Sequence, residues 1–114
     1  MTQARRALGI SGENAVAAWY EQNGYEVIAR NWRCRAGELD LILRKNRTFV
    51  FCEVKTRTSD AFGAPVEAVT RVKQVKIRHL AARWLEDAPV WPTDIRFDVA
   101  SVLAGEIEVL EGAF

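Results

Sequence analysis

The chain has 114 residues, of which 49% are hydrophobic and 27% are charged, and its formal net charge is +1. This length predicts one domain, 1–114, with a core that needs no disulfides. The balance of residues is that of a soluble globular protein. No apolar run approaches the roughly 18 residues of a membrane span, and the basic N-terminal segment lacks the apolar stretch of a signal peptide.

The two cysteines, Cys34 and Cys52, stand singly, without a CxxC spacing. Isolated cysteines favour reduced thiols and therefore a cytoplasmic location, with a disulfide between the two as the less favoured alternative.

The first predicted helix covers 11–24, with Ser11 as its N-cap and Gly24 as its stop. At 100° per residue, Glu13 falls on the same face as the apolar residues Val16, Ala17 and Tyr20. From this segment alone we interpret Glu13 as an ordinary first-turn acid, which the helix dipole favours.

Three strands follow, at 25–31, 38–44 and 48–56, and a polar hairpin signal, "RKNR", separates the last two. A long helix is predicted over 65–87, beginning at Pro65. Two closing strands then flank Ala104 and Gly105, at 94–103 and 106–111. This order predicts an α/β fold in which helices flank a mixed five-stranded sheet, α-β-β-β-α-β-β.

The third strand, "TFVFCEVKT", carries Glu53 and Lys55 on the same face as two phenylalanines, Phe49 and Phe51. Its other face is also apolar, which predicts a central strand covered on both sides. Charges at the end of such a strand are costly unless they have partners.

The preceding strand places Asp40 and Ile42 on one face, opposite Leu39, Leu41 and Leu43. A hairpin loop of four residues, 45–48, would put Asp40 directly across from Glu53, with Cβ atoms about 5 Å apart. Two carboxylates this close repel each other, and a divalent cation between them removes the conflict.

This arrangement suits hydrolysis of a phosphodiester with Mg²⁺ or Mn²⁺. Mg²⁺ prefers one or two carboxylates together with waters and phosphate oxygens. It stabilises developing charge and acidifies a bound water, while Lys55 either supplies a positive charge or takes a proton. The spacing alone is a weak pattern, because a half-exposed strand also alternates charged and apolar residues.

The long helix adds Lys73 near the centre of a predicted apolar stripe formed by Val66, Val69, Val72, Ile77, Leu80, Ala81 and Trp84. Lys73 either extends along its apolar neighbours to the surface or reaches the acidic cluster or a phosphate. Arg71 and Arg78 fall on the opposite face, and we interpret them as solvated surface.

Basic residues are frequent in the middle of the chain, among them Arg33, Arg35 and Arg57. Such a patch suits a phosphate backbone, although spread basic residues are also common on ordinary surfaces. On a closing strand, Arg96 and Asp98 alternate, and we interpret them as a structural ion pair.

Between Gly12 and Val99 the chain resembles the YraN-like family of small bacterial proteins, most specifically in "GELDLI" followed by "FCEVKTR". That family is similar to the PD-(D/E)xK restriction-endonuclease-like superfamily, and to its Holliday junction resolvases in particular. The resemblance implies a single nuclease-like domain with a restriction-endonuclease-like core. The proline of the superfamily motif is absent, since Leu39 precedes Asp40.

Carried onto this chain, the resemblance implies metal ligands at Asp40 and Glu53, with the carbonyl of Val54 as a third candidate. It makes Lys55 the motif lysine and gives Glu13 a place beside the metal, which reverses the dipole interpretation. Candidates for contact with nucleic acid are Lys73 and, more weakly, Arg57 and Gln74, together with the basic residues Arg33 and Arg35.

Three hypotheses follow, because a fold does not fix a function. The first is a Mg²⁺-dependent endonuclease acting on DNA, structure-selective for branched or repair intermediates, with a homodimer expected if two strands are cut. The second is a binding module for nucleic acid or protein with little or no turnover. The third is that the charged strand end only solubilises a small α/β domain.

Overall fold

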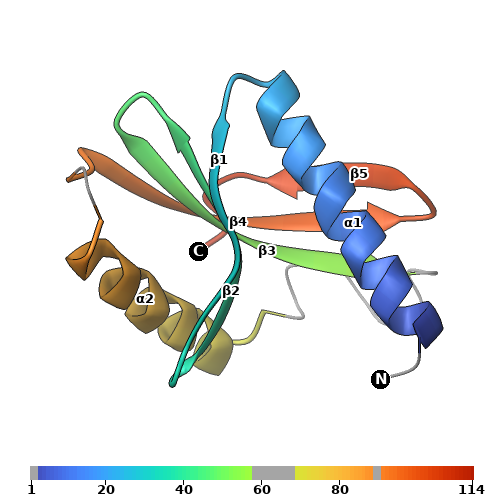
Figure 1. The fold of residues 1–114 in the computed structure, drawn as a ribbon, viewed down its shortest axis with the longest axis horizontal. Helices are drawn as coiled ribbons and strands as arrows, with labels where there is room; N and C mark the ends of the chain where they lie inside the picture. Colours follow the sequence, from blue (N-terminus) through green and yellow to red (C-terminus); the bar gives the residue numbers. More distant parts are fainter. Residues whose placement is uncertain (1–2, 58–68, 89–90) are drawn as a thin grey trace.

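Two helices and five strands make up the fold in a computed structural model, which describes residues 3–57, 69–88 and 91–114, with the side chains of 4–7 left out. In chain order (Figure 1) they are α1 (Gln3–Gln22), β1 (Glu26–Cys34), β2 (Gly37–Lys45), β3 (Thr48–Arg57), α2 (Arg71–Glu86), β4 (Asp94–Leu103) and β5 (Glu106–Leu110). The α/β class and the order α-β-β-β-α-β-β are confirmed. No helix in the described ranges is both long and apolar enough to cross a membrane.

The five strands form one sheet in the order β1-β2-β3-β4-β5. β3 and β4 run parallel, while the other neighbouring strands are antiparallel. The sheet is therefore mixed, as expected. Parallel neighbours need a long crossover, and α2 lies in the connection between β3 and β4.

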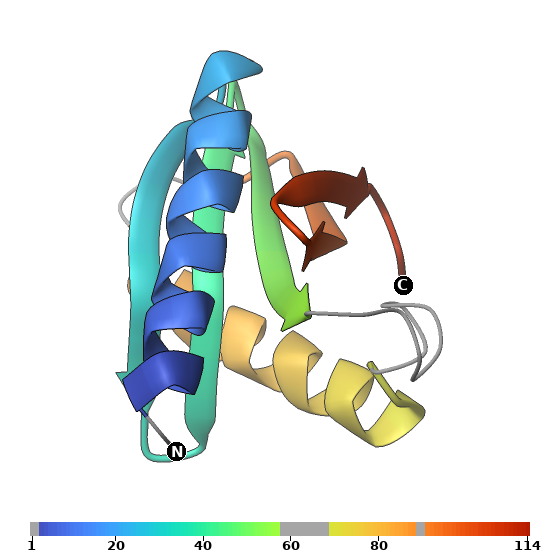
Figure 2. The ribbon, with the colours of Figure 1, turned by 90° about the vertical axis from the view of Figure 1, so that its right-hand side faces the viewer.

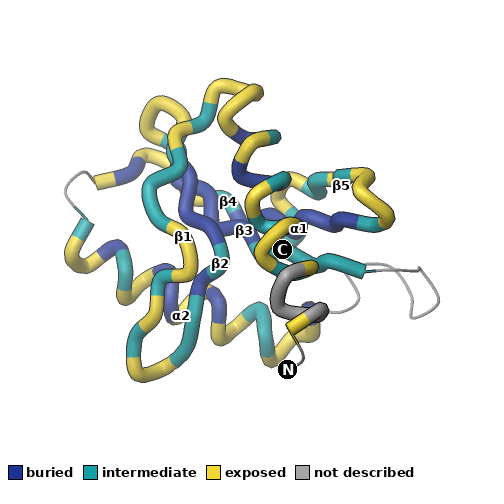
Figure 3. The backbone as a smooth tube through the Cα atoms, turned by 45° about the vertical axis from the view of Figure 1, so that its right-hand side comes forward, coloured by how far each residue is buried: buried dark blue, intermediate teal, exposed yellow. Residues whose placement is uncertain are grey.

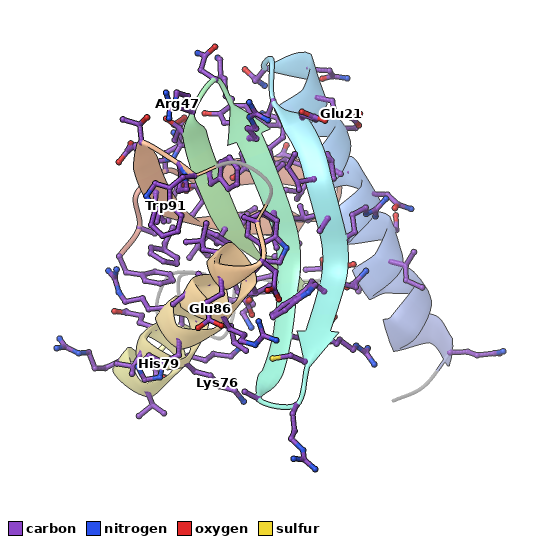
Figure 4. The ribbon with its side chains drawn as sticks, turned by 60° about the vertical axis from the view of Figure 1, so that its left-hand side comes forward. Glu21, Arg47, Lys76, His79, Glu86 and Trp91 are labelled. Carbon is purple, nitrogen blue, oxygen red and sulfur yellow. The ribbon has the colours of Figure 1, made fainter. Side chains whose placement is uncertain are left out.

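The helices cover opposite faces of the sheet, with α2 in front and α1 behind in Figure 4. Phe49 and Phe51 pack in the cluster on the α2 side, while Val50 and Cys52 pack in the cluster on the α1 side. The middle strands are accordingly the most buried part of the backbone (Figure 3). This confirms that β3 is a central strand covered on both faces.

The first helix begins at Gln3, so the prediction that Ser11 caps it is wrong. The preceding segment, "QARRALGI", is rich in good helix formers and has no proline, so nothing in it stops the helix. Its end was predicted correctly: α1 stops at Gln22, and Gly24 follows with a φ of 87°, which glycine adopts readily.

The second helix begins at Arg71, later than predicted, with the Thr70 side chain accepting from the Lys73 amide as an N-cap. Pro65 and Val66 lie outside the described residues. Val69 is buried just before the helix, but Val72 is 80% exposed, so its place in the apolar stripe was wrong. The helical wheel itself accounts for the error, because at 100° per residue Val72 falls about 180° from Ala81 and about 140° from Ile77. The buried face of α2 consists of Ile77, Leu80, Ala81 and Leu85.

The first strand extends to Cys34 instead of ending at Asn31. Asn31 has a φ of 51°, which distorts the strand locally, and pairing with β2 resumes at Trp32. The β2–β3 turn is tighter than the predicted four residues, because Lys45 pairs with Thr48. Asn46, with a φ of 57°, allows this turn without glycine, since asparagine tolerates the left-handed conformation.

A buried ion pair joins β4 to α1 and to the segment after β5. Arg96 binds Asp98 through two contacts of 2.9 Å, which confirms the predicted pair. Asp98 is fully buried and also accepts from the Tyr20 hydroxyl at 2.6 Å and from the Gly112 amide at 3.0 Å. The pKa of Tyr20 is raised by burial and by its acidic surroundings, so its hydroxyl stays a donor. The network therefore fixes α1 against the sheet.

The first helix approaches the sheet closely at Gly12, where an added Cβ would lie 2.0 Å from Oγ1 and 3.1 Å from Cβ of Thr56. We expect Gly12→Ala to lower the free energy of unfolding by about 1–3 kcal/mol, because overpacking outweighs the gain in helix propensity. Urea denaturation measures the change.

Gly9 is the matched control, since nothing lies within 4 Å of its added Cβ. Gly9→Ala should stabilise the chain by up to about 1 kcal/mol. Equal stabilisation by both substitutions would contradict the close packing of α1 on Thr56.

Candidate active site

The candidate site lies where β2 and β3 separate. Backbone pairing between them is regular from Lys45–Thr48 to Leu41–Cys52. Beyond that pair, a side chain replaces the backbone as the partner of β3, because Oδ2 of Asp40 accepts from the Val54 amide at 2.9 Å. The register carries Asp40 to the position across from Glu53, as the sequence predicted.

The sidedness predicted for Leu39 was wrong. Leu41 and Leu43 pack on the α1 side, but Leu39 packs on the α2 side with Ile42. Simple alternation fails at Asp40, because its carboxylate binds a backbone amide of the adjacent strand. The carboxylate therefore lies between the strands and not squarely on either face.

Glu53 connects β3 with α2. Its Oε1 lies 3.5 Å from Nζ of Lys55 and 3.4 Å from Nζ of Lys73. The Glu53 side chain is only 14% exposed, so its negative charge is held in a partly dry setting between two amines. Figure 2 shows β3 running toward α2, which explains how a helix so much later in the chain supplies Lys73. Of the two alternatives left open for Lys73, the structure therefore supports the one in which its amine reaches an acidic residue, Glu53.

Glu13 approaches the same region from the other helix. It is half-buried in the middle of α1, ten residues after the helix begins at Gln3. The first-turn explanation for this acid therefore fails, because the dipole effect fades within one turn. Its charge is one of the lesser causes that raise the pKa of Asp40.

The electrostatics of the cluster reflect crowding of like charges. Burial and then the charge of Glu53 raise the pKa of Asp40 to about 7, against the lowering effect of the Val54 amide. Burial and then the adjacent Lys73 amine lower the pKa of Lys55. The hydrogen bond with Lys55 raises the pKa of Lys73 despite its partial burial. An acid that resists ionisation and an amine that resists protonation are typical of functional sites.

The donor set fits a small hard cation. Asp40 and Glu53 are carboxylates that repel each other in a partly buried place, and Mg²⁺ needs only one or two carboxylates from a protein. Within residues 3–57, 69–88 and 91–114, no three Asp, Glu, His or Cys side chains form a group that could hold a metal. Asp40 and Glu53 are therefore the two carboxylates that would hold a cation here, and the Val54 carbonyl and Glu13 are the further ligands that the sequence predicts.

The other residues predicted to contact nucleic acid are Gln74, Arg57, Arg33 and Arg35. Gln74 donates to the Val69 carbonyl at 3.1 Å and so supports the start of α2. Arg57 ends β3. Arg33 pairs with Glu38 at 3.1 Å near the tip of the β1–β2 hairpin, and Arg35 is exposed in its turn.

One basic residue near the site was missed. Lys76 lies one helical turn after Lys73, and its side chain rests against Gly37 at the β1–β2 turn (Figure 4). The spacing of three from Lys73 was the available signal, since such residues are neighbours on a helix. Lys76 thus connects α2 to the hairpin that carries Arg33 and Arg35.

The raised pKa of Asp40 gives the metal-free protein a defined pH dependence. In the folded chain Asp40 keeps its proton up to about pH 7, while its ordinary value is 3.8. The folded state therefore binds more protons between these limits. The stabilisation of the folded state by the protonated Asp40 is complete below pH 3.8. It is lost as the pH rises through about 7.

We expect the free energy of unfolding, measured with urea in EDTA, to fall by at most about 4 kcal/mol from this group between about pH 4 and pH 8. Asp40→Asn should remove most of that slope. Asp94 is exposed, so Asp94→Asn is the control and should keep the full slope of unfolding free energy against pH. A slope unchanged in Asp40→Asn would show that Asp40 does not carry the effect.

Comparisons with known proteins concern nearly the whole chain. Residues 12–102 match the model of a family described as "Uncharacterised protein family UPF0102". A UPF0102 protein of Beutenbergia cavernae is 49% identical, over 96% of this chain and 98% of its own length. One from Frankia alni is 46% identical over 98% of each chain, and one from Nocardia farcinica is 54% identical over 87% of this chain and 78% of its own.

Proposed function

Because the chain belongs to the uncharacterised protein family UPF0102, its function must be inferred from its site, and we propose a metal-dependent nuclease that hydrolyses phosphodiester bonds in DNA. The predicted YraN-like membership is confirmed by the same matches. The observation that carries the proposal is the meeting of Asp40, Glu53, Lys55 and Lys73 where β2 and β3 separate.

Each residue of the cluster has a role in this proposal. Asp40 and Glu53 would hold Mg²⁺ or Mn²⁺, with the Val54 carbonyl and Glu13 as additional ligands. The bound cation supplies charge stabilisation and a more acidic water. Lys55, whose pKa is lowered, is suited to accept a proton from the attacking water or to orient that water. Lys73, which stays charged, is suited to the phosphate.

Branched DNA is the substrate class that we propose, and a homodimer follows from it, because cutting a two-fold junction takes two sites. The basic residues of the β1–β2 hairpin and α2 support contact with a phosphate backbone, with Arg33, Arg35, Arg57, Lys73 and Gln74 as the candidates.

A binding module without turnover is the second candidate, and one observation favours it. Glu53 is already paired with two lysines, so its charge is compensated in the absence of any metal. Such a cluster could position lysines for phosphate binding without hydrolysis.

The experiment that tests the proposal is cleavage of a labelled panel by the purified protein with Mg²⁺ or Mn²⁺. The panel contains single strands, duplex, flap and four-way junction DNA, and RNA. Asp40→Ala and Lys55→Ala are assayed alongside. Loss of cleavage in both variants would establish the nuclease activity. The nucleic acid of the panel that is cleaved fastest would identify the substrate class. Tight binding without cleavage by a folded protein would favour the binding module.

A further inference from the structure

A second feature lies away from the candidate active site, between the C-terminal half of α2 and the last residues of the chain. It is a cavity of about 410 Å³. Its wall is mostly apolar and contains two arginines, the lining residues being Arg78, Ala81, Ala82, Leu85, Ile95, Arg96, Phe97, Gly112 and Phe114. Pockets that bind small ligands typically have this size and an apolar wall with few polar groups.

The two arginines differ in their partners. Arg96 is bound to the buried Asp98 and to Glu111. Arg78 has no carboxylate partner among the described residues. Its guanidinium instead lies 4.7 Å from the ring centroid of Phe97 and 5.6 Å from that of Phe114. Arg78 is exposed, as the sequence predicted, and it lines the cavity as a cation without a carboxylate partner in the described ranges.

The aromatic side chains give the wall its shape. Phe97 and Phe114 stack with their centroids 5.3 Å apart and their planes 20° from parallel. The Ala113 amide donates to the Phe97 carbonyl at 2.8 Å, which holds this end of the chain on β4. Together with Leu85 and the small residues of α2, the rings form a surface that accommodates a flat apolar group.

We propose that this cavity binds a compact aromatic anion, with the ring against the apolar wall and the negative group on Arg78. Charge complementarity selects the anion, because Arg78 is the cation here without an acidic partner in the described ranges. The planar guanidinium suits a carboxylate or phosphate and tolerates a ring beside it. This inference does not depend on the nuclease proposal, since none of the lining residues belongs to the Asp40–Glu53 cluster.

Phenyl phosphate is the probe, titrated into ¹⁵N-labelled full-length protein and followed by backbone amide shifts. We expect saturable shifts at Phe97 and Gly112, with the low-millimolar affinity usual for a ligand of this size. Arg78→Gln should weaken binding about tenfold or more. Arg71→Gln, on the same helix but outside the cavity, should leave it unchanged.

Two further comparisons separate this site from nonspecific anion binding. Benzyl alcohol and inorganic phosphate should each bind at least about tenfold more weakly, because each lacks one half of the recognised group. Ala82→Leu should weaken the binding of phenyl phosphate by filling the cavity while keeping Arg78. Equal binding of inorganic phosphate, unchanged affinity in Arg78→Gln, or no shifts at the lining residues would overturn the proposal.

Discussion

Replacing Glu53 with glutamine is expected to lower metal-dependent cleavage by at least about 100-fold, since even residues that only support metal ligands cost 10- to 100-fold. The amide keeps the shape of the side chain but removes its charge. It also leaves Lys55 and Lys73 without their shared carboxylate. Substrate binding should therefore be retained or become tighter. Single-turnover cleavage and fluorescence anisotropy measure the two effects separately.

Glu38→Gln is the matched control for this experiment. Glu38 lies on β2 and pairs with the exposed Arg33, so its loss removes the same charge while the contacts of Glu53 with Lys55 and Lys73 stay in place. Of the charges that raise the pKa of Asp40, that of Glu38 contributes least. We expect its cleavage rate to stay within about threefold of the original, as for an exposed ion pair. Full activity in Glu53→Gln would mean that this carboxylate takes no part in catalysis.

The largest expected effect on stability comes from Asp98→Ala. Asp98 is fully buried and accepts from Arg96, the Tyr20 hydroxyl and the Gly112 amide. Its removal leaves the partly buried Arg96 and two donors without their acceptor, although Arg96 keeps Glu111. We expect the free energy of unfolding to fall by about 3–5 kcal/mol in urea denaturation, as for other broken buried pairs.

Asp87→Ala provides the comparison, because Asp87 also pairs with an arginine, Arg83, but at the surface. Its cost should be about 0–1 kcal/mol. A similarly small loss for Asp98→Ala would contradict the view that the Asp98 network fixes α1 against the sheet.

The register of the candidate site could be predicted from sequence because it follows from the two-residue period of strands. Alternation placed Glu53 and Lys55 together, and an even hairpin loop placed Asp40 opposite Glu53. The four-residue loop and the observed two-residue turn give the same register, since both keep Arg44 paired with Phe49. The order of elements was predictable for a similar reason, because long periodic segments dominate it.

Features set by distant contacts could not be read in this way. Leu39 departed from alternation because the Asp40 side chain binds the amide of another strand. The start of α1 is a different case, because the helix formers that extend it from Ser11 back to Gln3 were present in the local sequence. Local patterns also gave no sign that Arg78 would lie over Phe97 and Phe114, which are far from it in the chain.

The most direct test of the central claim is a titration of the ¹⁵N-labelled protein with Mn²⁺, whose unpaired electrons broaden nearby amide signals. The Val54 amide donates to Asp40 and lies next to Glu53, so it is the reporter. We predict that Val54 and its neighbours broaden first, that Mg²⁺ in excess reverses the effect, and that Asp40→Asn abolishes it. Broadening centred elsewhere, or unchanged in Asp40→Asn, would contradict a metal site at Asp40 and Glu53.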